Sequence, residues 1–180
     1  MNSYIMKNFE EVLYTEEQIN TRVEELANEI SKDYTNKEVI IIGLLKGSFL
    51  MVSDLVKKLT VDTKIDFLSV SSYGNSTTSS GKIQINKDIN IDVEGKHIII
   101  VDDLIDTGQT LNWIKNHFQH KRPESIKICC LLNKKVERNN DINIDYVGFD
   151  CPNKFVVGYG MDYAEHYRTL PFIGVLKPIV

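Results

Sequence analysis

The chain has 180 residues, of which 42% are hydrophobic and 26% are charged, and its formal net charge is −4. This length favours one domain over residues 1–180, because two domains would each be too small for a substantial core. The weak negative charge and the lack of a long apolar run give no reason to expect a nucleic acid or membrane partner, and the N-terminus does not resemble a signal peptide, so we expect a cytoplasmic protein.

The first predicted element is an amphipathic helix that begins after Thr15. The stretch Thr15-Glu16-Glu17-Gln18 has the form of a capping box, in which the two end side chains bond to the backbone at the helix start. Apolar residues then recur at helical spacing, at Ile19, Val23, Leu26, Ala27 and Ile30.

A strand buried on both faces is predicted from Val39 to Leu45, because the run is continuously apolar. A second helix follows and is expected to bury Phe49, Val52, Leu55, Val56 and Leu59. The turn between them holds Lys46, Gly47 and Ser48, whose amides and ammonium group are available to an anion. Taken alone, this stretch is more typical of a plain turn with a solvated lysine.

Thr63 to Ser71 is predicted to be a further strand, with Ile65, Phe67 and Val70 at apolar positions. The polar stretch Ser71–Gly81 has too few apolar anchors to stay ordered by itself, so we expect a mobile loop that is either an active-site lid or a surface linker. Alternating isoleucines from Ile83 onward then predict a short excursion of antiparallel strands before Gly95.

The most informative stretch runs from Lys96 to Leu111. A buried parallel strand, His97 to Val101, is followed by Asp102 and Asp103, at the edge where open α/β sheets bind ligands. Such a pair suits sugar hydroxyls or a hydrated divalent cation. The residues after it predict an anion cradle at the start of a helix, namely Asp106, Thr107, Gly108, Gln109 and Thr110.

No Walker loop and no dinucleotide fingerprint is present in the sequence. The alternative for the stretch is a buried strand that ends in solvated aspartates. The ordered combination of acid pair, third acid and phosphate loop disfavours that alternative.

The rest of the chain completes an α/β pattern. A strand is predicted from Ile126 to Leu132, with Lys134 and Lys135 just beyond it, and three short strands at Asp145–Phe149, Phe155–Tyr159 and Phe172–Leu176. Strands that alternate with helices predict a largely parallel sheet flanked by helices, with a small appendage from the loop and the chain ends. The three cysteines, Cys129, Cys130 and Cys151, lack metal-site spacing and are expected to be reduced packing residues.

The stretch from Asp102 to Thr110 resembles the phosphoribosyl pyrophosphate (PRPP) signature of type I phosphoribosyltransferases. Nearly the whole chain is similar to the bacterial hypoxanthine-guanine members of that family. The resemblance implies the type I fold, with a small hood and a mobile active-site loop. It also matches Lys46 and Gly47 to a pyrophosphate loop whose peptide before the lysine is commonly cis, and Ser72-Tyr73-Gly74 to the closing loop.

The resemblance assigns a role to each remaining candidate. Asp106 would accept the proton from N7 of the base, and Lys134 would read the 6-oxo group. Phe155 would stack on the base, Val156 would contact it through the backbone, and Arg168 would bind pyrophosphate. The expected cofactor is Mg²⁺, with Asp102, Asp103 and Asp162 as its carboxylates. Many members have a glutamate where this chain has Asp102.

Local sequence alone favours plainer roles for three of these residues. Phe155 reads as a core aromatic, Lys134 as a solvated lysine and Asp162 as a turn acid.

The implied function is purine salvage, in which the 5-phosphoribosyl group of PRPP passes to hypoxanthine or guanine in a homodimer or homotetramer. The alternatives are a xanthine-preferring enzyme, a non-catalytic regulator that senses PRPP, and a receiver-like domain with a metal pocket at Asp102 and Asp103. The regulator is disfavoured because no basic stripe or appended helix-turn-helix is present. The receiver leaves the Thr107–Thr110 cradle and Lys134 unexplained.

Overall fold

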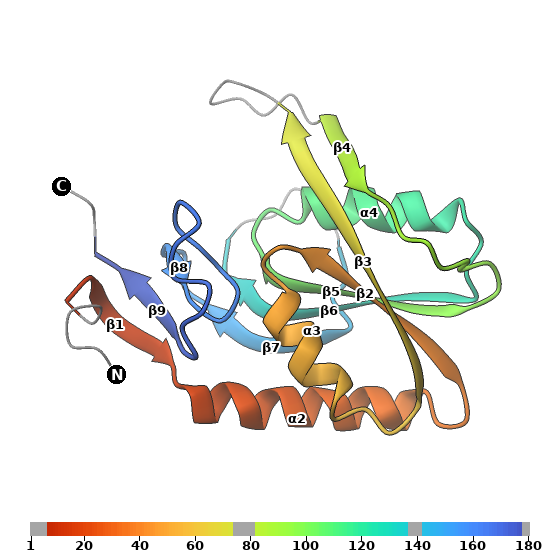
Figure 1. Cartoon of the computed structure of the whole chain (residues 1–180), viewed down its shortest axis with the longest axis horizontal. Coiled ribbons are helices and arrows are strands. Elements are labelled where there is room, and N and C mark those ends of the chain that lie inside the picture. Colours follow the sequence, from red (N-terminus) through yellow and green to blue (C-terminus); the bar gives the residue numbers. More distant parts are fainter. Residues whose placement is uncertain (1–6, 74–81, 137–141, 178–180) are drawn as a thin grey trace.

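A computed structural model describes residues 7–73, 82–136 and 142–177 of the chain. Figure 1 shows a central sheet with a separate small sheet beside it, where both described chain ends lie. The helices are α2 (Glu16–Asp33), α3 (Phe49–Val56) and α4 (Gln109–Gln119). The strands are β1 (Phe9–Tyr14), β2 (Glu38–Leu45), β3 (Asp62–Tyr73), β4 (Lys82–Lys87), β5 (His97–Ile105), β6 (Ser125–Lys134), β7 (Tyr146–Cys151), β8 (Val156–Val157) and β9 (Ile173–Leu176).

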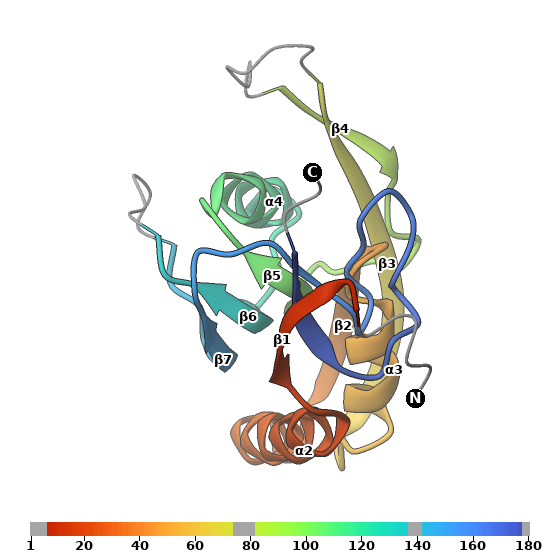
Figure 2. The ribbon, with the colours of Figure 1, turned by 90° about the vertical axis from the view of Figure 1, so that its left-hand side faces the viewer.

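The large sheet has six strands in the order β4-β3-β2-β5-β6-β7. All neighbours are parallel except β4, which runs antiparallel to β3. Helices α2 and α3 cover one face and α4 covers the other, so the molecule has three layers (Figure 2). Two apolar cores follow from this arrangement, and the central strands β2 and β5 contribute alternate residues to each.

The first helix forms as its sequence predicts. Thr15 and Gln18 make the reciprocal bonds of a capping box, and Ile19, Val23 and Leu26 are fully buried. Helix α4 likewise buries Leu111, Ile114 and Phe118 on the predicted face.

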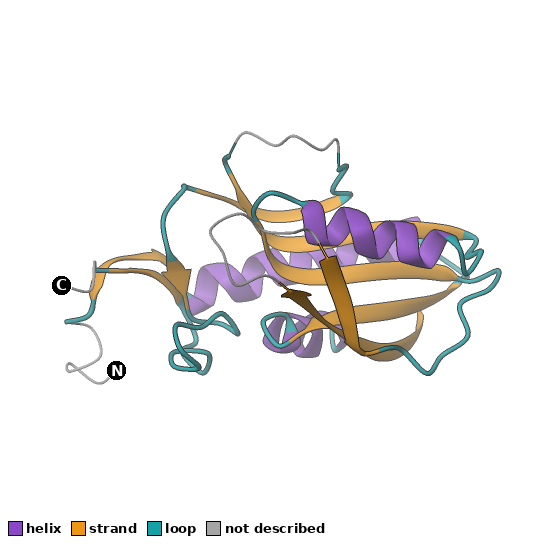
Figure 3. Cartoon of the chain, turned by 90° about the horizontal axis from the view of Figure 1, so that it is seen from above, coloured by secondary structure: helices purple, strands orange, loops and turns teal. Residues whose placement is uncertain are grey.

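The small sheet, in the order β1-β9-β8, is antiparallel and forms the hood of the molecule. Figure 3 shows it projecting beyond one end of the large sheet, next to both described chain ends. Strand β1 was not predicted. Its sequence, FEEVLY, interrupts apolar residues with two glutamates, and it becomes a strand only by pairing with β9, more than 150 residues away.

Several predicted details are wrong. Strand β4 extends the large sheet and does not belong to the appendage. Ile65 is 44% exposed, whereas Leu68 of β3 is fully buried, and Met51 is buried where Phe49 is only half-buried. Lys134 is the last residue of β6, whereas the prediction placed it beyond the strand. The three cysteines are free and buried, as predicted.

No helix in the described part of the chain has the length and apolar character needed to cross a bilayer. The predicted mobile loop lies mostly at residues 74–81, outside the described residues.

Arg22 ties α2 to the edge strand β7. Its guanidinium donates to the carbonyl of Val147 at 2.8 Å and to that of Gly148 at 2.9 Å. We expect Arg22→Met to lower the free energy of unfolding by about 1–3 kcal/mol in urea titrations, because two partly buried carbonyls lose charged donors.

The matched control is Arg122→Met, which removes an exposed pair with Glu94. It should cost at most about 1 kcal/mol. Equal losses of unfolding free energy in the two variants would show that the contact of Arg22 with β7 adds no more stability than an exposed ion pair.

Candidate functional site

The turn after β2 brings a lysine and a glycine to the carboxyl edge of the sheet. The Leu45–Lys46 peptide is cis, as the resemblance implies. Ser48 is buried and donates its hydroxyl to the Leu44 carbonyl at 2.8 Å, which fixes the turn against β2. Lys46 is exposed, and Gly47 lies against Asp103, so closely that a Cβ on Gly47 would collide with that carboxylate.

Asp102 and Asp103 are the half-buried carboxylates near the end of β5. The amide of Asp103 donates to the Asp102 carboxylate at 3.0 Å. Burial, and then the neighbouring charge of Asp103, raise the pKa of Asp102 well above its usual value. Burial also raises the pKa of Asp103. The pair therefore resists carrying two negative charges unless a cation joins it.

The predicted anion cradle forms the turn between β5 and α4. Gly108 caps the helix with a φ of 76°, in the left-handed region that favours glycine, and a Cβ there would press on Ile142. A pocket of about 190 Å³ opens at this helix start. It is lined by Asp102, Leu104, Ile105, Asp106, Thr107, Gly108, Thr110 and Leu111. The first amides of α4 are available there to an anion.

Strand register brings Asp106 and Lys134 together. Ile105, the last residue of β5, pairs with Asn133 of β6, so Asp106 comes next to Lys134, the last residue of β6. Their side chains form an ion pair at 3.4 Å. Lys134 is only 13% exposed, so its interpretation as a solvated lysine is wrong.

The segment after β8 returns to the β2 turn. Gly158 and Gly160 have φ values of 101° and 102°, and a Cβ on Gly160 would collide with the Gly47 carbonyl. Tyr159 is buried between them and donates its hydroxyl to Asp54 of α3 at 2.8 Å. This segment is thus anchored against both α3 and the turn that holds Lys46.

Arg168 is held in the site by two contacts. It donates to the Gly160 carbonyl at 2.8 Å and pairs with Asp162 at 2.9 Å, and its side chain is 17% exposed. Its Nε is buried and has no hydrogen-bond partner among the described residues. Asp162 is therefore part of a charged cluster and is not an isolated turn acid.

A pocket of about 330 Å³ gathers residues from all these segments. Its walls are Lys46, Gly47, Asp103, Leu104, Phe155, Val156, Met161, Asp162 and Arg168. Seven of these nine residues are site candidates of the sequence analysis, and for Val156 the expected contact is through its backbone. The other six are Lys46, Gly47, Asp103, Phe155, Asp162 and Arg168. Leu104 and Met161 were missed because a lone apolar residue next to charged ones carries no signal of its own.

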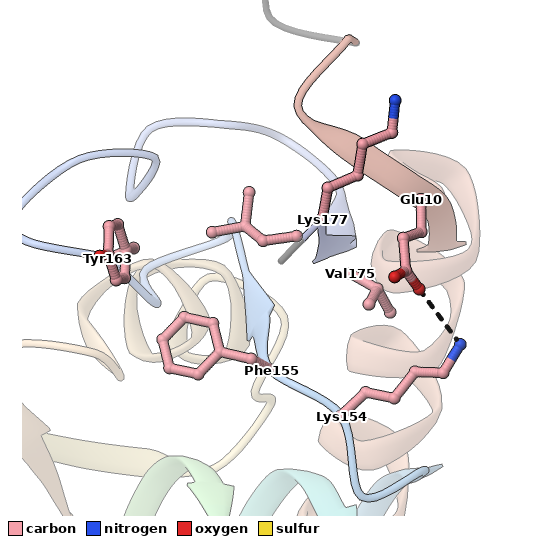
Figure 4. A pocket seen from close by; sticks show the side chains of 7 residues that line it. Glu10, Lys154, Phe155, Tyr163, Val175 and Lys177 are labelled. Carbon is pink, nitrogen blue, oxygen red and sulfur yellow. Dashed lines mark ion pairs between the residues drawn. The ribbon is translucent and has the colours of Figure 1, made fainter. Parts of the chain in front are cut away.

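Phe155 forms one wall of this pocket and is 55% exposed, so its interpretation as a core aromatic is wrong. The Tyr163 ring meets it edge-on, with centroids 5.8 Å apart. On the other side, Phe155 and Tyr163 line a second, mostly apolar pocket of about 470 Å³ under the hood, with the Glu10–Lys154 ion pair at its rim (Figure 4). Val156 is buried in β8.

The remaining candidates are placed less completely. Ser72 and Tyr73 end β3, where their backbones pair with Ile83 and Lys82 of β4. Gln109 and Thr110 begin α4. Gly74 and the rest of the predicted closing loop lie outside the described residues.

One contact of the site was not predicted at all. The Glu165 carboxylate lies 2.9 Å from the Lys46 ammonium and 3.4 Å from the Arg168 guanidinium. The hydrogen bond from Lys46 lowers the pKa of Glu165. Because 119 residues separate Glu165 from Lys46, no local pattern could have revealed the pair.

The carboxylates fit a magnesium ion that is shared with a ligand. Among the described residues, no three His, Cys, Asp or Glu side chains gather closely enough to hold a metal by themselves. Asp103 and Asp162 nevertheless line one pocket, and Asp102 adjoins Asp103. Mg²⁺ is commonly bound by one or two carboxylates together with substrate phosphates and water.

Comparisons with known proteins agree with this geometry. The phosphoribosyl transferase domain family matches residues 11–164. The chain is 48% identical over 173 residues to the hypoxanthine-guanine phosphoribosyltransferase of Bacillus subtilis, which covers 96% of each protein. It is 43% identical over 171 residues to the protein of the same name from Streptococcus mutans, which covers 95% of each.

Solved structures give the same result. A hypoxanthine phosphoribosyltransferase from Staphylococcus aureus matches with a TM-score of 0.95 at 44% identity, over 99% of this chain and 97% of that one. The family and fold predicted from the sequence are thereby confirmed.

The raised pKa of Asp102 predicts how stability depends on pH. Between the ordinary aspartate pKa of about 4 and the higher value in the folded state, the folded chain holds more protons than the unfolded chain, so the free energy of unfolding falls as pH rises. Asp102→Asn keeps the acceptor for the Asp103 amide and removes one charge. Without ligand, we expect it to be more stable than the parent at pH 8 by about 1 kcal/mol.

The advantage should shrink toward pH 4 in urea titrations at several pH values. The control is Asp92→Asn, which changes an exposed carboxylate. An Asp102→Asn profile parallel to that of the parent would contradict the buried-pair interpretation.

Proposed function

This chain belongs to the phosphoribosyltransferase family, and we propose that it transfers the 5-phosphoribosyl group of PRPP to N9 of hypoxanthine or guanine. The products are IMP or GMP and pyrophosphate. The observation that carries this proposal is the Asp106–Lys134 pair, which stands next to the anion cradle. It offers an acceptor and a donor side by side where a base would meet the activated sugar.

The polar groups divide naturally between the parts of PRPP. The 5-phosphate would lie in the cradle, against Thr107, Gly108, Thr110 and the amides of α4, with Gln109 at the rim. The ribose hydroxyls would face Asp102 and Asp103. The pyrophosphate would bind between the Lys46–Gly47 turn and Arg168, whose buried Nε has a donor to offer.

The base would lie between Phe155 and the edge of the large sheet. The ring of Phe155 is a flat apolar surface for stacking, and the backbone of Val156 would contact the base edge. A 6-oxopurine presents O6 next to N7. Lys134 would donate to O6 while the Asp106 carboxylate accepts the proton on N7. Adenine would instead present its 6-amino group, so that two hydrogen-bond donors would face each other and adenine would be rejected.

Transfer develops positive charge on the ribose and negative charge on the leaving pyrophosphate. Asp102 and Asp103 would stabilise the positive charge on the ribose, and Arg168 and Lys46 the negative charge on pyrophosphate. Magnesium, held by Asp102, Asp103 or Asp162 together with substrate oxygens, would supply further charge to the departing pyrophosphate. Asp106 would remove the N7 proton as the new bond forms at N9.

The closing loop implied by the resemblance lies mostly outside the described residues; its role would be to exclude water, which competes with the base for the activated sugar. We further propose a single domain, a cytoplasmic location, and a homodimer or homotetramer.

An ultraviolet assay with PRPP, magnesium and each of hypoxanthine, guanine, xanthine and adenine tests the function directly. Rapid use of the first two is expected. Faster use of xanthine would replace this proposal with a xanthine-preferring enzyme. PRPP binding without pyrophosphate release would favour a non-catalytic sensor.

Asp106→Asn removes the proposed base and retains the shape of the side chain. We expect kcat to fall by about 10²- to 10⁴-fold, the usual contribution of general base catalysis. The dissociation constant of PRPP, measured by calorimetry, should change little. A variant as fast as the parent would remove the assignment of Asp106 as the base.

Lys134→Gln replaces a charged donor to the 6-oxo group by a neutral amide. We expect kcat/KM for guanine and hypoxanthine to fall by about 10- to 100-fold. Lys135→Gln is the matched control, because Lys135 is the exposed neighbour that pairs with Asp150. If both variants kept parental kcat/KM values, Lys134 would have no part in base recognition.

A further inference from the structure

The Glu165 carboxylate contacts both cations that are proposed to bind pyrophosphate. A single oxygen, Oε2, lies 2.9 Å from the Lys46 Nζ and 3.4 Å from a terminal nitrogen of Arg168. These two cations come from different parts of the chain, one from the β2 turn and one from the segment after β8, and both line the pocket. Glu165 therefore bridges the site where an anionic ligand would also bridge it.

The backbone around Glu165 holds the carboxylate there. Tyr163 and His166 exchange two hydrogen bonds, of 3.1 and 2.9 Å, so that Ala164 and Glu165 form a two-residue hairpin turn. Both have positive φ values, 48° and 65°, at positions where asparagine and glycine are usual. The Glu165 amide also donates to Asp162 at 2.8 Å. An unusual backbone conformation thus presents this side chain to the site.

A pyrophosphate group needs the same contacts. Phosphate oxygens bind guanidinium and ammonium groups through charge-assisted hydrogen bonds, as a carboxylate does. Lys46 and Arg168 have further N–H donors, but a ligand phosphate that reached both cations would stand beside the negative charge of Glu165. The binding of the carboxylate and of the phosphate is therefore mutually competitive.

We propose that Glu165 is an internal competitor of pyrophosphate, which bridges Lys46 and Arg168 in the ligand-free protein and gives them up when the pyrophosphate group binds. This inference rests on the proposed function. Glu165 would weaken the binding of ligands that carry pyrophosphate. It would not affect a 5′-nucleotide, which lacks that group. After transfer, the return of Glu165 to its two cations would oppose the rebinding of the product.

The test is Glu165→Gln, which keeps the size of the side chain and removes its charge. Dissociation constants for PRPP, magnesium pyrophosphate and IMP are measured by calorimetry on the parent and the variant. We expect the constants for PRPP and pyrophosphate to fall together by about two- to fivefold, the range for one exposed ion pair. The constant for IMP should not change. The matched control is Glu94→Gln, which removes an exposed pair with Arg122 away from the site and should alter none of the three.

Three results would overturn the inference. The first is an unchanged dissociation constant for pyrophosphate. The second is a higher dissociation constant for pyrophosphate, which would make Glu165 a positioning residue for Arg168. The third is an equal gain in affinity for IMP, which would indicate a general charge effect. The parent protein separates this inference from the proposed function. If the parent binds pyrophosphate but forms no nucleotide, the function fails and Glu165→Gln still decides the inference; if it does not bind pyrophosphate, both fail.

Discussion

The site depends on two close contacts of Gly47. The Asp103 carboxylate of β5 lies where a Cβ on Gly47 would be, and the Gly47 carbonyl lies where a Cβ on Gly160, in the segment after β8, would be. Parallel strands bring their carboxyl ends to one edge. The two glycines then allow an approach close enough for Lys46, Asp103 and Arg168 to line one pocket.

This close approach crowds opposite charges into a small volume. Lys134 pairs with Asp106, Lys46 with Glu165, and Arg168 with Asp162. In a chain with a net charge of −4, the cations proposed to receive a highly charged anion are thus already matched by carboxylates. Under the proposed function, ligand binding would exchange these ion pairs for new ones, and its free energy would include the difference between the two sets.

Sequence predicted the parts of the fold that local chemistry determines. The capping box at Thr15, the inward face of α4 and the strand before Asp102 follow from periodicity and side-chain type, and the structure has all three. Family resemblance supplied the residues that local reasoning undervalued. Phe155 reads locally as core and Lys134 as solvated, yet Phe155 is exposed on a pocket wall and Lys134 is nearly buried.

What sequence could not supply were contacts between distant segments. Strand β1 exists because β9 pairs with it, and the Glu165 carboxylate meets Lys46 of another element. The apolar positions of β3 were predicted only in part for a similar reason: Phe67 and Val70 pack against the cores, but Ile65 is exposed and the buried Leu68 was missed. Which of its residues enter the core depends on the neighbouring strands and helices, and the sequence of β3 alone does not contain that information.

The pairing of β1 with β9 has a consequence for how the chain folds. Phe9 lies opposite Leu176, and β9 in turn holds β8, which follows Phe155. Contacts between residues so far apart close the largest loops and are the costliest in chain entropy. The loop between β5 and α4 rests on segments that are closer in sequence, such as β2 and β6. Phe155 precedes β8, whose partner β9 is the last described strand, so a chain arrested before β9 would retain the proposed anion cradle and lack support for the proposed base-stacking wall.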